Sequence, residues 1–210
     1  KLIKADINVP LIGFTGSPWT LFVYLFYGES PKNRNEIQDY LKLNSSKTHS
    51  YLKAMTEVMH DYVHAQIQSG ADCIQIFDSW GGMLDSEYEE FSLMYINELA
   101  ENIPANIPVI LFTRGKKIDS IIESTNINCF NLDISDNIDH HIDKSIVIQG
   151  NFDPSKFHSD ADKLEQLATQ IFEKYKNKNN YIFNLGSGLT PDIDPEKVGI
   201  FLEKLSSLSS

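Results

Sequence analysis

The feature that most constrains the fold is a regular alternation of short apolar runs with longer stretches of helical periodicity. The apolar runs are rich in β-branched and aromatic residues, which is typical of strands buried in a parallel sheet that helices cover. Six runs are predicted to be strands: Val9–Phe14, Cys73–Phe77, Pro108–Phe112, Cys129–Leu132, Ile146–Ile148 and Tyr181–Asn184. Helices are predicted at Thr20–Tyr27, Ser46–Ser69, Glu87–Glu101, Ala161–Lys176 and Pro195–Leu205. The sequence therefore predicts an α/β fold with a parallel sheet.

Small, polar and glycine-rich residues follow the predicted strands, whereas the strand starts show no such enrichment. Thr15–Ser17, Asp78–Gly82 and Thr113–Gly115 are three of these clusters. In α/β folds ligands bind at the carboxyl ends of strands, and a (β/α)8 barrel builds its whole site there. A closed barrel needs eight strands and usually about 250 residues. We therefore predict a single domain, 1–210, of the (β/α)8 TIM-barrel type that lacks the first one or two β/α units.

Composition and charge exclude several classes of partner. The chain has 210 residues, of which 41% are hydrophobic and 22% charged, as in ordinary globular domains. Its net charge of −11 argues against a nucleic acid or an anionic membrane surface as partner. No apolar run approaches the roughly 20 residues that span a bilayer, and the first residues lack the apolar core of a secretion signal. We expect a cytoplasmic protein.

The cysteines and histidines do not form a predicted metal site. Cys73 and Cys129 lie within predicted strands, where buried thiols are favoured over a disulfide or half of a metal site. His60 and His64 lie four residues apart on one predicted helical face, a spacing compatible with metal. No third ligand is evident nearby, so a surface or interface pair is favoured. The pair His140-His141 lies among aspartates and is interpreted as a solvated, charged turn.

Three segments together resemble the uroporphyrinogen decarboxylase family, in the family's order and approximate spacing. They are Pro10–Leu21 followed by Tyr24, Gln66–Asp72 leading into Gln75–Gly82, and Gln149–Pro154 with Ile182–Gly186 further on. The resemblance implies a (β/α)8 barrel, usually a homodimer, that removes carbon dioxide from the four acetate side chains of uroporphyrinogen III. The product is coproporphyrinogen III, in porphyrin and haem biosynthesis. The resemblance also implies no metal or organic cofactor, because a protonated pyrrole ring serves as the electron sink.

Five positions carry over from the family as substrate-binding residues, of which four lie near the first two predicted strands. Tyr24 matches the family's active-site tyrosine, although a core tyrosine is an alternative. Ser79 matches the serine that hydrogen-bonds a substrate carboxylate, although a helix cap or turn residue is an alternative. Phe14 and Phe77 are interpreted as apolar walls for the pyrrole rings, although phenylalanines at strand ends are core residues by default. Asp78 is interpreted as a residue that orients a turn, and not as a catalytic acid.

The fifth position, Ser187, departs from the family. The family pattern Asn-Leu-Gly-His-Gly corresponds here to residues 184–188, with serine in place of the histidine that contacts substrate. Serine keeps a hydrogen-bond donor but loses the reach and the titratable charge of imidazole. The family's arginine-rich segment and the aspartate that accepts the pyrrole N–H groups are expected upstream of residue 1, so no catalytic residue is assigned. Arg114, Lys116 and Lys117 either assist with substrate carboxylates or form a solvated basic loop.

Two other functions stay open. A truncated or degenerate family member would bind a tetrapyrrole without turnover. A corrinoid-dependent methyltransferase of the same barrel superfamily would hold zinc through cysteine and histidine near strand ends, whereas Cys73 and Cys129 lie inside predicted strands without a His-x-Cys pattern.

Overall fold

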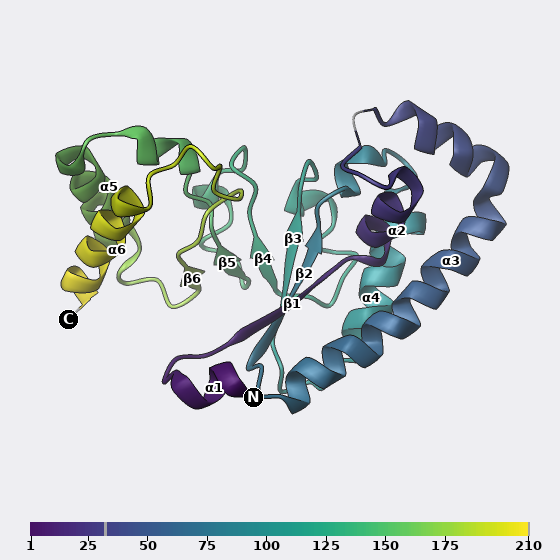
Figure 1. Ribbon diagram of the computed structural model, residues 1–210, viewed down its shortest axis with the longest axis horizontal. Coiled ribbons are helices and arrows are strands. Elements are labelled where there is room, and N and C mark those ends of the chain that lie inside the picture. Colours follow the sequence, from purple (N-terminus) through teal and green to yellow (C-terminus); the bar gives the residue numbers. More distant parts are fainter. Residues whose placement is uncertain (32, 210) are drawn as a thin grey trace. The chain divides into compact units, whose positions relative to one another are not determined.

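The computed structural model describes residues 1–31 and 33–209, which form two compact units, Lys1–Asn131 and Leu132–Ser210. Each unit contains parallel strands that follow one another in sequence order, with helices in the connections (Figure 1). No helix in the described part of the chain is both long enough and apolar enough to cross a membrane.

The first unit is built on four parallel strands in the order β1-β2-β3-β4. These strands are β1 (Ile12–Gly16), β2 (Cys73–Asp78), β3 (Val109–Thr113) and β4 (Cys129–Asn131). The helices are α1 (Leu2–Asp6), α2 (Pro18–Tyr27), α3 (Asn35–Gln68) and α4 (Met94–Glu101). Shorter turns are a π-helical segment at Glu89–Leu93 and 3₁₀ helices at Gly81–Met83 and Ile118–Ser120.

The helices of the first unit cover one face of its sheet, and this decides which strand residues are buried. Helices α2, α3 and α4 lie on the same side of the strands (Figure 1). Successive strand residues point to opposite faces, and in β2 Ile74 and Ile76 are completely buried under the helices. On the opposite face, Phe14 of β1 is 61% exposed. In a barrel of this type that second face is the interior, where strand-end side chains meet the ligand.

The second unit combines two short parallel strands with a pair of packed helices. Its elements are 3₁₀ helices at Ile138–His140 and Pro154–His158, strands β5 (Val147–Gln149) and β6 (Tyr181–Ile182), and helices α5 (Ala161–Tyr175) and α6 (Pro195–Ser209). Helix α5 begins at Asp160, whose carboxylate accepts the backbone N–H of Lys163 at 2.8 Å, the usual N-cap arrangement. One cluster of buried core residues in this unit consists of Phe157, Leu164, Ala168, Ile193 and Phe201.

The predicted α/β class with parallel strands is confirmed, and each of the six predicted strands overlaps an observed one. The largest difference in the helices is α3, which begins at Asn35 and not near Ser46. Its helical angles are interrupted at Asn44 (φ −133°, ψ 26°), and the short part before this kink, which buries Ile37 and Leu41, was not predicted. The predicted helix at Glu87–Glu101 is divided into the π-helical segment and α4. That the chain forms one domain stays a prediction.

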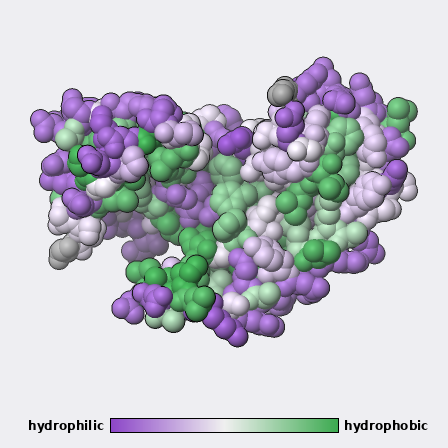
Figure 2. Space-filling view, viewed as in Figure 1, coloured by the Kyte–Doolittle hydropathy of each residue, from purple (hydrophilic) through white to green (hydrophobic). Residues whose placement is uncertain are grey.

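Helix α1 was not predicted. It has no buried residue, and Leu2 and Ile3 are 87% and 62% exposed. Figure 2 shows the apolar area that these side chains form on the surface over α1. Because the segment buries no apolar face, its sequence lacks the periodic pattern that marks a helix.

Candidate active site

A row of phenylalanines lies on the uncovered face of the first unit, near the carboxyl ends of its strands. The ring centroids of Phe14 (β1) and Phe77 (β2) are 6.1 Å apart, and those of Phe77 and Phe112 (β3) are 5.7 Å apart. Both pairs have the edge-to-face geometry that aromatic rings prefer. The rings form an apolar wall, of which Phe14 is the most exposed member and Phe112 is buried. Such a wall suits a ligand with flat, apolar rings.

Ser79 follows β2 directly, in a turn that packs against the loop after β3. The backbone N–H of Gly82 donates to the carbonyl of Arg114 at 3.0 Å, and a Cβ at Gly82 would lie 2.7 Å from that same oxygen. Only glycine allows the two loops to approach this closely. The Ser79 side chain is half-buried, and its hydroxyl makes no hydrogen bond within the residues that the structure describes. It is therefore available to a ligand.

Tyr24 lies on α2 and faces the same turn. Its ring is 6.0 Å from that of Trp80, edge to face, and the residue is 42% exposed. The indole N–H of Trp19 donates to the carbonyl of Trp80 at 2.9 Å, which ties α2 to the turn after β2. Tyr24 and Ser79 therefore project from two segments that are fixed to each other. Tyr24 is not the core residue that the alternative interpretation required.

Asp78 is a completely buried carboxylate that joins three segments of the first unit. Its Oδ1 accepts hydrogen bonds from Ser17 Oγ at 2.6 Å, Ser92 Oγ at 3.0 Å and Thr20 Oγ1 at 3.5 Å. Ser17 is the N-cap of α2, and Ser92 belongs to the π-helical segment. Burial raises the pKa of Asp78 although these hydroxyls oppose the shift, and burial beside Asp78 raises the pKa of Tyr88 well above its ordinary value. The arrangement agrees with the interpretation of Asp78 as a residue that orients a turn.

Basic side chains follow β3 at the same edge of the sheet. Arg114 and Lys117 are exposed, and neither side chain has an ion pair within the described residues. Lys116 instead lies over the Tyr88 ring, 4.9 Å from its centroid, and donates to the carbonyl of Asp85 at 3.3 Å. Lys116 therefore holds the loop, whereas Arg114 and Lys117 are free to meet an anionic ligand.

In the second unit, the two parts of the third resembling segment, Gln149–Pro154 and Ile182–Gly186, lie side by side. The N–H of Phe152 donates to the carbonyl of Asn184 at 3.0 Å, and the N–H of Gly186 donates to the carbonyl of Phe152 at 2.9 Å. Asn151 Nδ2 donates to the carbonyls of Asp133 and Asp136 at 2.6 and 2.7 Å. Ser187 comes next in the chain, half-buried and with no hydrogen bond from its hydroxyl among the described residues.

The cysteines are free thiols, as predicted, with Cys129 buried and Cys73 half-buried. No group of three histidine, cysteine, aspartate or glutamate side chains that could hold a metal ion is found within residues 1–31 and 33–209. The rings of His60 and His64 lie 4.3 Å apart, and His64 Nε2 is 3.0 Å from the carbonyl of Asn102. That geometry is a side-chain pair on the surface of α3.

We expect both thiols to react slowly with iodoacetamide, because only the thiolate is nucleophilic. Burial raises the pKa of Cys73 to about 11 and that of Cys129 to about 12. At pH 8 alkylation of the folded chain, followed by mass spectrometry, should be at least about 100-fold slower than in urea, where thiols have a pKa of about 8.5. Equal rates in both conditions would contradict this prediction.

The predicted solvated turn at His140-His141 is only half right. His140 is exposed, but His141 is 3% exposed. The 3₁₀ helix at Ile138–His140 directs His141 inward, and the backbone N–H of His141 donates to the carbonyl of Ile138 at 2.9 Å. The abundance of aspartates indicated the exposed half correctly but could not show which way the second ring points.

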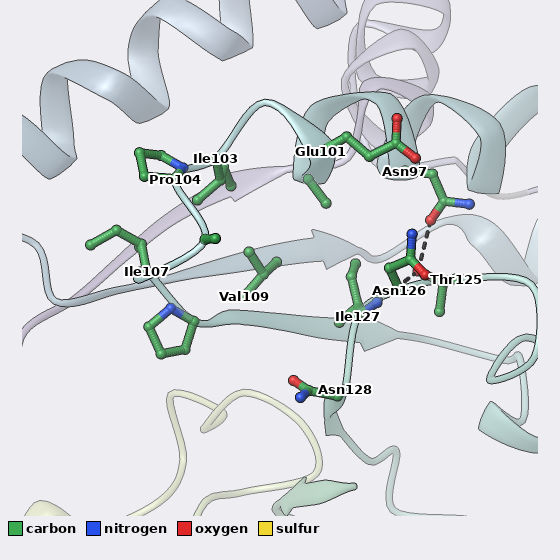
Figure 3. A pocket seen from close by; sticks show the side chains of 13 residues that line it. Asn97, Glu101, Ile103, Pro104, Ile107, Val109, Thr125, Asn126, Ile127 and Asn128 are labelled. Carbon is green, nitrogen blue, oxygen red and sulfur yellow. Dashed lines mark hydrogen bonds between the residues drawn. The ribbon is translucent and has the colours of Figure 1, made fainter.

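A pocket of about 240 Å³ lies at the opposite end of the strands from Ser79, near the starts of β3 and β4 (Figure 3). Its lining includes the apolar residues Ile103, Ile107 and Val109 and three asparagine side chains, and Thr125 Oγ1 donates to Asn97 Oδ1 at 2.7 Å. Glu101 is the charged residue that lines it, and none of its lining residues is cationic. A pocket with this lining does not suit a polycarboxylate, so the strand-end cluster is the better candidate for the active site.

Parallel strands in sequence order, with available side chains at their carboxyl ends, define an α/β protein of the (β/α)8-barrel type. The chain belongs to the uroporphyrinogen decarboxylase family, because the model of that family, described as uroporphyrinogen decarboxylase, matches residues 1–208. The uroporphyrinogen decarboxylase of Hydrogenovibrio crunogenus is 38% identical over 97% of this chain and 60% of its own length. That of Francisella tularensis subsp. novicida is 36% identical over 100% and 64%. The chain thus spans less than two thirds of these relatives.

Solved structures of low sequence identity share the fold. A methyltransferase from Methanosarcina mazei aligns with a TM-score of 0.73 at 18% identity, over 100% of this chain and 62% of that one. A putative vitamin-B12 independent methionine synthase from Listeria monocytogenes aligns with a TM-score of 0.56 at 12% identity, over 96% and 65%. At these identities the likeness concerns the fold alone, so the methyltransferase alternative has no further support from it.

Proposed function

We propose that this chain forms part of the substrate site of a uroporphyrinogen decarboxylase. The observation that carries the proposal is the cluster at the carboxyl ends of β1 and β2, where Phe14 and Phe77 form an apolar wall and the hydroxyls of Tyr24 and Ser79 are available. Tyr24 and Ser79 match positions at which the family resemblance implies contact with substrate. The wall would receive pyrrole rings, and the hydroxyls would donate to substrate carboxylates.

The proposed reaction needs positioning and electrostatics more than a reactive side chain. Protonation of a pyrrole carbon makes the ring cationic. The bond between the acetate methylene and its carboxylate then breaks, the electron pair moves into the ring, and carbon dioxide leaves. The methylene carbon finally takes a proton and becomes a methyl group while the ring loses one. Since the chain carries a net charge of −11, cations must be concentrated near the substrate, and the exposed Arg114 and Lys117 are the candidates in the first unit.

Further parts of the proposal rest on the family alone. They are turnover without a metal or organic cofactor, and a homodimer. A cytoplasmic location and a single domain formed by residues 1–210 are proposed from the sequence pattern. Ser187 is proposed to lie at the substrate in the place of the family histidine.

The test is conversion of uroporphyrinogen III to coproporphyrinogen III, measured by chromatography, with the 210-residue chain and with the product of its whole gene. We expect Ser187→His to be tolerated, because a Cβ at the neighbouring Gly188 would meet nothing within 4 Å. The new imidazole should raise kcat about tenfold, the effect of one added hydrogen bond to a charged group. Loss of activity in this variant would mean that the loop has been rebuilt for another geometry.

Absence of conversion by both proteins, with both folded, would reject the decarboxylase. Binding of uroporphyrinogen III without conversion would then favour the second candidate, a tetrapyrrole binder. The observation in favour of that candidate is the serine at position 187.

A further inference from the structure

A single side chain holds both backbone groups of Phe14. Gln66, near the end of α3, accepts the Phe14 N–H on Oε1 at 3.0 Å and donates from Nε2 to the Phe14 carbonyl at 3.0 Å. A carboxamide that makes both bonds reproduces the pattern a neighbouring strand would offer. The two residues are 52 positions apart in the sequence, so this contact depends on the tertiary fold.

The direction of the bonds shows which edge of β1 the carboxamide covers. Leu11 and Ser17 point their backbone groups toward β2: the Leu11 carbonyl accepts the Asp72 N–H, and the Ser17 N–H donates to the Phe77 carbonyl, both at 2.8 Å. Successive residues of a strand alternate in this respect, so Phe14 points its backbone groups to the other edge. There Gln66 meets them.

The residue before Phe14 is adapted to this contact. A Cβ at Gly13 would lie 2.7 Å from Gln66 Oε1, closer than side chains pack in folded proteins. Glycine at this position is therefore what lets the carboxamide reach around the strand. The pairing of Gly13 with Gln66 explains a glycine that neither a turn nor a positive φ requires.

We infer that Gln66 is a positioning residue for substrate binding, acting through Phe14. This inference rests on the proposed function, in which the Phe14 ring meets a pyrrole ring. By binding both the N–H and the carbonyl of Phe14, Gln66 fixes the backbone beneath a ring that is 61% exposed. Gln66 also occupies the backbone N–H and carbonyl of Phe14. A strand placed beside this edge of β1 would therefore have to pair with residues of β1 other than Phe14.

The experiment measures hydrogen exchange of the Phe14 amide by NMR and binding of uroporphyrin III, a stable oxidised octacarboxylate, by quenching of tryptophan fluorescence. Gln66→Met keeps the length of the side chain but removes both hydrogen bonds. We expect it to speed Phe14 exchange at least tenfold and to raise the Kd about tenfold. The control Gln68→Met lies on the same helix with its side chain exposed, and should change neither quantity.

A double-mutant comparison separates positioning from general stability. Phe14→Leu alone should raise the Kd about tenfold, and adding Gln66→Met should raise it less than twofold further. Gln66→Glu serves as a second variant, because its carboxylate can still accept the Phe14 N–H but cannot donate to the Phe14 carbonyl. Exchange of the Phe14 amide should therefore stay slow in this variant, while the Kd for uroporphyrin III rises.

Unchanged exchange in Gln66→Met would overturn the clamp, and additive effects on the Kd would overturn the positioning role. If the wild-type chain binds no uroporphyrin III, the proposed function fails and the substrate role of Gln66 fails with it, whereas the exchange measurement still decides whether the clamp exists.

Discussion

Asp78→Ala is expected to lower the free energy of unfolding by about 4 kcal/mol. Removing the carboxylate leaves the Ser17 and Ser92 hydroxyls, which now donate to it at 2.6 and 3.0 Å, buried without an acceptor. Each unsatisfied buried polar group costs about 1–3 kcal/mol, and the lost volume adds a cavity cost. Since these hydroxyls belong to two different segments, both segments should loosen together. Urea unfolding followed by circular dichroism measures the effect.

The matched variant is Asp78→Asn, which keeps an oxygen for the hydroxyls and should cost less than Asp78→Ala. Burial raises the pKa of Asp78, so the folded chain keeps this proton at pH values where the unfolded chain has lost it. The contribution of Asp78 to the free energy of unfolding is therefore fully present below the ordinary aspartate pKa of about 4. It is lost as the pH rises through the raised pKa. Relative to wild type, Asp78→Asn should gain stability over that range. Equal losses for Asp78→Asn and Asp78→Ala would contradict a hydrogen-bonding role.

Ser79→Ala is expected to lower kcat/KM for uroporphyrinogen III by about 10- to 100-fold, without loss of stability. The Ser79 hydroxyl has no partner among the described residues, so its removal breaks no internal hydrogen bond. A hydrogen bond to a charged group is worth about 1.5–3 kcal/mol, and 1.4 kcal/mol is a factor of ten. Steady-state kinetics with the product of the whole gene measures the effect.

Tyr24→Phe should give a loss of the same order, because the ring contact with Trp80 at 6.0 Å remains and only the hydroxyl disappears. The controls are Ser86→Ala and Tyr62→Phe, which remove hydroxyls from exposed residues and should leave kcat/KM unchanged. Full activity in Ser79→Ala and Tyr24→Phe would remove both from the substrate site.

Much of the fold could be predicted because its signals are local. Apolar runs identified the strands, and helical spacing identified most helices. The polar clusters after the strands indicated where a site would lie, since parallel strands bring their carboxyl ends to one edge. The failures concern segments that bury little: α1 buries nothing, and the part of α3 before the kink at Asn44 buries only Ile37 and Leu41.

The sequence by itself indicated the succession of strands and helices, the edge of the sheet where a site is expected, and Phe14, Tyr24, Phe77 and Ser79 as candidate residues. Only the tertiary structure decided that Gln66 clamps Phe14 and that Asp78 collects hydroxyls from α2 and the π-helical segment. It likewise decided that His141 is buried. The physical reason is that periodicity reports which face of an element is apolar, whereas a hydrogen bond between residues 52 or 61 positions apart exists only after packing has brought the two segments together.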